Sequence, residues 1–277
     1  MASKYEQRAV LFLDVLGFKR LIDLKREDLV EEALMVTSAQ YQSNYEISAF
    51  SDNMAVSLKF ERGYELLDLI HFASYLAWHL LHKGVMSRGG VAVGELFHKN
   101  GIVYGPALVS AYQLESQVAC YPRIVLEKDA VAKSLEIGGN PPGCEDSIRE
   151  QLRTDFDGWE HIHLMSHKAM MPFHEMLSPE ARQANGEISH SALLVSKVTA
   201  ARKALENNPP SDLRSVSKHD WMRRYVDYYE NIYNHGPQWR PLPIAGAMLQ
   251  SVPNAIEIPN VSKIEPLPEN GSASNKV

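Results

Sequence analysis

Apolar runs alternate with amphipathic stretches over the first half of the chain. Residues 9–13 form a continuous apolar run that ends at Asp14, which is typical of a buried central strand. Other short apolar runs between turn-forming residues predict strands, and apolar side chains at helical spacing predict helices. The predicted strands cover residues 9–13, 47–50, 54–60, 87–96, 102–104 and 124–126. The predicted helices cover residues 19–42, 64–83, 106–117 and 129–135.

The order of these elements is strand, helix, strand, strand, helix, strand, strand, helix, strand. This order predicts an α+β fold with a ferredoxin-like core, an added hairpin and helices on one face of the sheet. The dipeptide Asn100-Gly101 predicts the tight turn of the added hairpin.

A segment rich in glycine and proline, residues 138–143, predicts the end of this core. We therefore expect a domain at residues 1–137, a mainly helical extension at residues 138–250 and a disordered tail at residues 251–277. Helices are predicted in the extension at residues 148–153, 192–207 and 219–234. Because the last of them is rich in tryptophan and tyrosine among mixed charges, we expect it to pack on the core.

Composition limits the classes of function. The chain is 45% apolar and 22% charged, with a net charge of -6, which is typical of a globular protein and does not favour binding to nucleic acid. The most apolar helix is interrupted by polar residues and is not expected to contact a membrane directly. The two cysteines have no metal-site spacing, and the first residues lack the apolar run of a signal peptide. We expect reduced thiols and a cytoplasmic location.

Two aspartates carry the candidate chemistry. Asp14 ends the first strand, and Asp52 lies in the turn between the second and third strands. In a split strand–helix–strand arrangement the third strand lies between the first and the second, so this turn and the end of the first strand share one edge of the sheet. Two carboxylates there can bind a pair of divalent cations that activate an attacking oxygen and stabilise a leaving one. The alternative is that both aspartates cap backbone N–H groups in turns.

The segment Asp14-Val15-Leu16-Gly17-Phe18 joins the first strand to the first helix. Gly17 permits a tight turn, and the N–H groups at the start of the helix offer a place for phosphate. This turn predicts where a triphosphate lies beside the aspartates. Phe18 and Phe50 are candidate contacts for the ribose or base, with core packing as the alternative.

Four segments resemble the class III adenylate and guanylate cyclases. Residues 10–18 (VLFLDVLGF) resemble the first metal motif of that family, and residues 50–56 (FSDNMAV) resemble the second. Residues 88–95 (RGGVAVGE) resemble the strand after the second helix, and residues 104–116 (YGPALVSAYQLES) resemble the segment that enters the dimer-interface helix. The segments occur in the order of the family.

The resemblance implies two Mn²⁺ or Mg²⁺ ions per site, bound by Asp14, Asp52 and the carbonyl of Val15. It also implies a nucleoside triphosphate substrate and a homodimer with shared active sites, in which one subunit supplies the metals and the other supplies base and transition-state contacts. The candidate substrate-binding residues are Val15, Leu16, Gly17, Phe18, Ser48, Phe50 and Arg88.

Several positions depart from the purine cyclases. Ser48 and Ile102 stand where those enzymes usually recognise the purine with a charged or polar residue, and neither can make the same contact. Val109 and Gln113 stand where an Asn and an Arg usually steady the transition state. The candidates for the missing positive charge are Arg88, Lys99 and Arg123.

This combination resembles the pyrimidine cyclases of the bacterial Pycsar anti-phage systems. The similarity lies in the FLDVLGF motif, the GPALV segment and the helical C-terminal extension. It implies conversion of UTP to 3′,5′-cyclic UMP and diphosphate, with a product that acts on a separate effector. One alternative is a cytidylate cyclase that makes cyclic CMP. Another, favoured by Val109 and Gln113, is a catalytically inactive nucleotide sensor with a cyclase-like fold.

Overall fold

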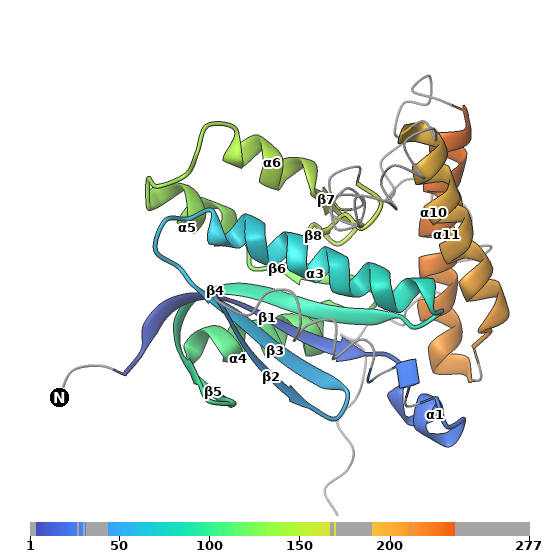
Figure 1. The fold of residues 1–277 in the computed structure, drawn as a ribbon, viewed down its shortest axis with the longest axis horizontal. Helices are drawn as coiled ribbons and strands as arrows, with labels where there is room; N and C mark the ends of the chain where they lie inside the picture. The colour runs from blue at the N-terminus through green and yellow to red at the C-terminus, as the bar shows by residue number, and fades with distance from the viewer. Residues whose placement is uncertain are drawn as a thin grey trace, which may run out of the picture. The chain divides into compact units, whose positions relative to one another are not determined.

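The computed structural model describes residues 4–26, 28–29, 31, 44–166, 169, 190–210 and 212–235. Within them, one sheet has the strand order β2-β3-β1-β4-β6-β8-β7, with β5 paired to β4 (Figure 1). The strands are β1 (Glu6–Val15), β2 (Tyr45–Phe50), β3 (Asn53–Lys59), β4 (Ser87–Lys99), β5 (Ile102–Tyr104), β6 (Ile124–Leu126), β7 (Leu152–Thr154) and β8 (Glu160–Ile162). The helices are α1 (Phe18–Asp23), α3 (Glu65–His82), α4 (Pro106–Gln113), α5 (Ala130–Glu136), α6 (Cys144–Glu150), α10 (His190–Asn207) and α11 (Leu213–His235).

The order β2-β3-β1-β4 confirms the predicted α+β fold with a ferredoxin-like core, and β5 completes the predicted hairpin. The apolar run of β1 lies in the middle of the sheet, antiparallel to both β3 and β4, where Ala9, Val10, Leu11 and Leu13 are fully buried. A strand buried on both faces accounts for the continuous apolar run. The β4–β5 turn has positive φ at both Asn100 and Gly101, as a two-residue type I′ turn requires.

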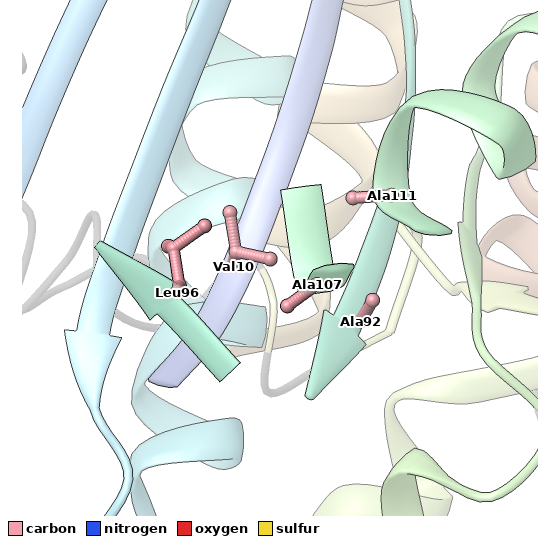
Figure 2. Packing of buried hydrophobic residues seen from close by; sticks show 5 residues of the cluster. All are labelled: Val10, Ala92, Leu96, Ala107 and Ala111. Atoms are coloured by element: carbon pink, nitrogen blue, oxygen red, sulfur yellow. The ribbon is translucent and has the colours of Figure 1, made fainter. Parts of the chain in front are cut away.

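Helices cover both faces of the sheet, which corrects the prediction that they cover only one (Figure 1). Tyr45, which shares a cross-strand row with Ala9, packs its ring 5.1 Å from the ring of Phe72 in α3. Val10 faces the opposite way and packs with Ala92 and Leu96 against Ala107 and Ala111 (Figure 2). The helix α4 therefore covers the face opposite α3.

A glycine allows α4 to lie close to the sheet. A Cβ atom at Gly90 of β4 would lie 2.2 Å from the carbonyl oxygen of Ala111 in α4. Beyond α4 the helix widens into a π-helical turn, η1 (Leu114–Val118), within the region predicted as one helix.

The helix predicted at residues 19–42 is interrupted. The helix α1 ends at Asp23, and Lys25 has a φ of 53°, a left-handed conformation that cannot continue a helix. The described residues 28, 29 and 31 are helical again, and the rest of the predicted range lies outside the described residues.

The extension adds two strands that the sequence did not predict. Residues 148–153, predicted as a helix, contain the end of α6 and the start of β7, and β8 pairs with β6 of the core. Arg123, which follows η1, is buried and forms ion pairs with Asp155 and Asp157 between β7 and β8. This side chain therefore serves the junction between core and extension.

The predicted helices at residues 192–207 and 219–234 correspond to α10 and α11. As expected, aromatic residues of α11 pack on the rest of the chain: Trp221 stacks on Tyr121, and the Tyr225 hydroxyl lies 2.6 Å from His163 Nδ1. In the part of the chain that the structure covers, no helix has the length and apolar character needed to cross a membrane. The domain limits remain a prediction, and residues 251–277 lie outside the described residues.

Candidate active site

Asp14 and Asp52 lie at the same edge of the sheet. Asp14, near the end of β1, pairs with Asn53, the first residue of β3. The amide of Val15 donates a hydrogen bond to the carbonyl oxygen of Asp52 over 2.8 Å. The β2–β3 turn is tight because Ser51 takes a left-handed φ of 57°. The strand order thus places the two residues as the sequence predicted.

Gly17 forms the turn between β1 and α1 with a φ of 78°, which favours glycine. The amides of Val15 and Leu16 donate to Asp52 and Met86, so neither is available to a phosphate group. At the start of α1 the first N–H groups have no partner within the helix, as at any helix N-terminus. Within the predicted phosphate-binding turn, residues 15–18, the first two amides are therefore excluded, and the N–H groups at the start of α1 remain as candidates.

Arg88 joins Asp14 to a buried acid. It lies beside Asp14 in the β1–β4 register, and its Nε donates a hydrogen bond to Asp14 Oδ2 over 3.0 Å. Its Nη2 forms an ion pair with Oε1 of Glu115 over 2.7 Å. The side chain of Glu115 is only 4% exposed, and burial raises its pKa while Arg88 opposes this shift. Arg88 is thus shared between two carboxylates.

A second cation comes from the C-terminal extension. Lys218, near the start of α11, interacts electrostatically with Arg88, Asp14 and Glu115; burial and Arg88 lower its pKa, and the two carboxylates raise it. Arg20 of α1 also donates to the carbonyl of Pro209 over 2.7 Å, which ties the turn region to the segment before α11. The extension therefore adds a basic side chain to the electrostatic surroundings of Asp14 and Glu115.

Glu115 and Lys218 are site residues that the sequence did not predict. For Glu115 a signal existed: it lies four residues after Ala111 and eight after Ala107, on the buried side of the α4 segment. An acid at a core-facing position implies a buried cationic partner. For Lys218 no local signal exists, because about 130 residues of chain separate it from Arg88.

The other predicted substrate-binding residues and candidate cations differ in their exposure and in their contacts. Phe18 and Leu16 are partly buried next to Gly17, whereas Phe50 is 84% exposed at the end of β2. Ser48 is partly exposed on β2, and its hydroxyl lies 3.0 Å from Nε2 of His98. Of the candidate cations, only Arg88 contacts Asp14; Lys99 ends β4 at the opposite end from Arg88, and Arg123 pairs with the extension.

The oxygen donors at this edge fit a hard divalent cation. Glu115 interacts electrostatically with two further carboxylates, those of Asp14 and Asp52, and with two basic side chains, Arg88 and Lys218. Asp14 Oδ2 accepts from Arg88 and Asp52 Oδ1 accepts from Asn53, while within the described residues the second oxygen of each aspartate accepts no hydrogen bond. No three His, Cys, Asp or Glu side chains in those residues form a metal-binding group alone. A backbone carbonyl and substrate phosphates would complete the shell, as is usual for Mg²⁺ and similar ions.

No family model and no curated protein matches this sequence. Among solved structures, the chain is similar to an adenylate/guanylate cyclase/hydrolase from Silicibacter pomeroyi, with 16% identity, a TM-score of 0.34, and coverage of 58% of this chain and 98% of that chain. It is also similar to a bacterial light-regulated adenylyl cyclase in two structures, each 14% identical, with TM-scores of 0.31 and 0.29. These matches cover 52% and 51% of this chain and 97% and 47% of theirs.

Proposed function

We propose that this chain is a nucleotidyl cyclase that converts UTP to 3′,5′-cyclic UMP and diphosphate at the edge formed by Asp14 and Asp52. The observation that carries the proposal is the direct backbone link between the two: Val15 donates to Asp52, and Asp14 pairs with Asn53. A turn with Gly17 follows the first aspartate, and Arg88 contacts its carboxylate. This is the arrangement of oxygen donors and positive charge that phosphoryl transfer uses.

In the proposed reaction the ribose 3′-hydroxyl oxygen attacks the α-phosphorus in line, and diphosphate leaves. Asp14, Asp52 and the Val15 carbonyl would hold two Mn²⁺ or Mg²⁺ ions, which lower the pKa of the 3′-hydroxyl and neutralise the triphosphate. The chain itself positions the carboxylates through the sheet and supplies positive charge through Arg88, held by the buried Glu115. Catalysis is then mainly positioning and charge stabilisation.

A homodimer with shared sites forms part of the proposal. Exposed apolar side chains gather on the β4–β5 hairpin and α4, a surface that favours a protein interface. They are Ile102 (59% exposed), Tyr104 (43%), Val109 (54%) and Tyr112 (52%). The dimer would bring Ser48, Ile102, Val109 and Gln113 of one subunit to the aspartates of the other.

We further propose that the cyclic nucleotide acts on a separate effector protein in the cytoplasm during phage infection, as the resemblance to the Pycsar cyclases implies. Expression of the chain with and without its neighbouring genes, followed by phage plating and measurement of cyclic UMP in infected cells, tests this role. Protection that persists when Asp52 is replaced by Asn would contradict it.

The decisive experiment is incubation of the purified protein with each of the four ribonucleoside triphosphates and Mn²⁺, with mass spectrometry of the products. We expect cyclic UMP from UTP. Cyclic CMP as the main product would identify a cytidylate cyclase. Nucleotide binding without any cyclic product would identify the inactive sensor, which the apolar Val109 favours.

A further inference from the structure

The turn between α10 and α11 lies against two segments that border the candidate site. Arg20 of α1 donates a hydrogen bond to the Pro209 carbonyl oxygen over 2.7 Å. The end of α10 approaches Gly84 so closely that a Cβ atom there would lie 2.7 Å from a carbonyl oxygen of α10. Two residues further on, the carbonyl oxygen of Met86 accepts a hydrogen bond from the Leu16 amide. The start of α11 therefore lies at the edge of the sheet that holds the two aspartates.

Lys218 lies on the inner side of α11. Trp221, three residues further on, is 5% exposed and stacks on Tyr121 with ring centroids 5.9 Å apart. Side chains three residues apart lie on the same face of a helix, so Lys218 shares the face that packs on the core. Tyr121 follows η1, the π-helical turn that contains Glu115. The face that carries Lys218 is thus directed toward Glu115, in agreement with the electrostatic interaction between the two side chains.

The charge of Lys218 has no direct partner. In the part of the chain that the structure describes, its ammonium group forms neither an ion pair nor a hydrogen bond with another residue, although the side chain is partly buried. Arg88, the neighbouring cation, is already engaged by Asp14 and Glu115. Burial and then the charge of Arg88 lower the pKa of Lys218, whereas Asp14, Glu115 and Asp212 raise it. Two cations held near each other, one of them half-buried and without a direct partner, favour the binding of an anion beside them.

The nearby aspartates do not remove this need. Asp14 cannot neutralise both a bound metal ion and Lys218, so the loaded site requires additional negative charge from a ligand. A triphosphate carries such charge on many oxygens, and the compact ammonium group of lysine can donate three hydrogen bonds to them.

We propose that Lys218 binds the triphosphate of the substrate, as a cation that the C-terminal extension supplies to the site. The identity of this ligand rests on the proposed function. Lys218 lies outside the four segments that resemble the cyclases, so the extension takes a direct part in substrate binding in addition to its packing on the core.

Calorimetric titration of the purified full chain with inorganic triphosphate and Mn²⁺ tests the contact without any turnover. We expect Lys218→Gln to weaken binding roughly 10- to 100-fold, because hydrogen bonds between charged groups are lost, and Lys218→Arg to retain most of the affinity. Lys203→Gln, at an exposed position of α10, is the matched control and should bind as the unaltered chain does. Equal affinity in Lys218→Gln would overturn the proposal, and so would an unaltered chain that does not bind inorganic triphosphate.

Chemical labelling of the unaltered chain tests the same contact without a variant that has to fold. Lysine acetylation is followed residue by residue by mass spectrometry, with and without a saturating concentration of inorganic triphosphate and Mn²⁺. We expect the ligand to slow the acetylation of Lys218 several-fold and to leave that of Lys203 unchanged. Equal rates at Lys218 with and without the ligand would overturn the proposal.

Kinetics separate this proposal from the proposed function. If the chain forms cyclic UMP, we expect Lys218→Gln to lower kcat/KM for UTP on the order of 10-fold or more. A chain that forms cyclic UMP while Lys218→Gln binds inorganic triphosphate normally would remain a cyclase, and the role of Lys218 would be refuted. Binding of inorganic triphosphate that depends on Lys218, without a cyclic product from any of the four ribonucleoside triphosphates, would refute the cyclase and support Lys218 as a phosphate contact.

Discussion

The amide of Val15 and the carbonyl oxygen of Asp52 share a hydrogen bond of 2.8 Å, so the residue after the first aspartate is fixed to the second aspartate through the main chain. This hydrogen bond joins main-chain atoms and does not involve the carboxylate of either aspartate. Side-chain substitutions at Asp14 and Asp52 can therefore test the chemistry with little effect on the position of the two backbones.

We expect Asp14→Asn and Asp52→Asn each to lower kcat with UTP and Mn²⁺ by roughly 10³-fold or more, because metal stabilisation of the transition state is worth several kcal/mol. Thermal unfolding should change little. The control is Asp146→Asn, an exposed residue of α6. Near-normal turnover in either site variant would remove the two-metal assignment.

Neutralising Glu115 should increase the requirement for metal. In Glu115→Gln, Arg88 loses one of its two acidic partners and is held mainly by Asp14. The Asp14 carboxylate then binds a metal ion less well, because the ion has to compete with Arg88. We expect the Mn²⁺ concentration for half-maximal activity to rise about 10-fold, which corresponds to roughly 1.4 kcal/mol. Glu145→Gln on α6, whose acid forms an exposed pair with Arg149, is the control. An unchanged Mn²⁺ titration would show that Glu115 has no influence on the aspartates.

The free energy of unfolding should decrease as the pH falls from about 6.5 to 4. Burial lowers the pKa of both His98 and His161 from 6.5 to about 4. The unfolded chain therefore binds protons before the folded chain does, so the stabilisation is complete above pH 6.5 and is lost as the pH falls toward 4. Each histidine accounts for on the order of 3 kcal/mol over the whole window. Denaturant unfolding in a pH series measures this slope, which should be shallower in His98→Phe. Equal slopes in the two proteins would contradict the burial of His98 in its neutral form.

Removing the Tyr225 hydroxyl should destabilise the extension without affecting chemistry. Tyr225 is 1% exposed, and its hydroxyl lies 2.6 Å from His163 Nδ1. Tyr225→Phe leaves a buried nitrogen without its partner, at a cost of about 1–3 kcal/mol. The control is Tyr64→Phe, whose hydroxyl bonds only with the exposed Arg62 among the described residues and should change the unfolding free energy by less than about 0.5 kcal/mol. Equal unfolding midpoints for the two variants would contradict the structural role of this contact.

The sequence predicted the edge that holds Asp14 and Asp52 because strand order follows from local patterns: a buried run for β1, a turn triplet before β3 and an Asn-Gly hairpin after β4. It was wrong about α4, which covers the face opposite α3. That packing depends on Gly90 and Ala92 of β4 accommodating Ala107 and Ala111, a tertiary contact that no local pattern encodes.

The same limit applies to the candidate site. Arg88 was a candidate because it lies in a strand motif, but Arg123 was an equal candidate, and only tertiary structure shows that Asp155 and Asp157 pair with it. The strands β7 and β8 have three residues each, too few to show the alternating pattern of a strand. They form because β8 pairs with the edge of β6 and β7 pairs with β8. Lys218 comes under the electrostatic influence of Asp14 and Glu115 because a helix distant in sequence, α11, lies near them.

The contact between Gly90 and α4 sets how far the exposed side of that helix stands from the sheet. Any residue with a Cβ at position 90 would push against the Ala111 carbonyl, and the helix would have to move outward. Val109 and Tyr112 are carried on the same helix, so they would move with it. The absence of a side chain at position 90 thus determines how far the exposed apolar residues of α4 project from the sheet toward another molecule.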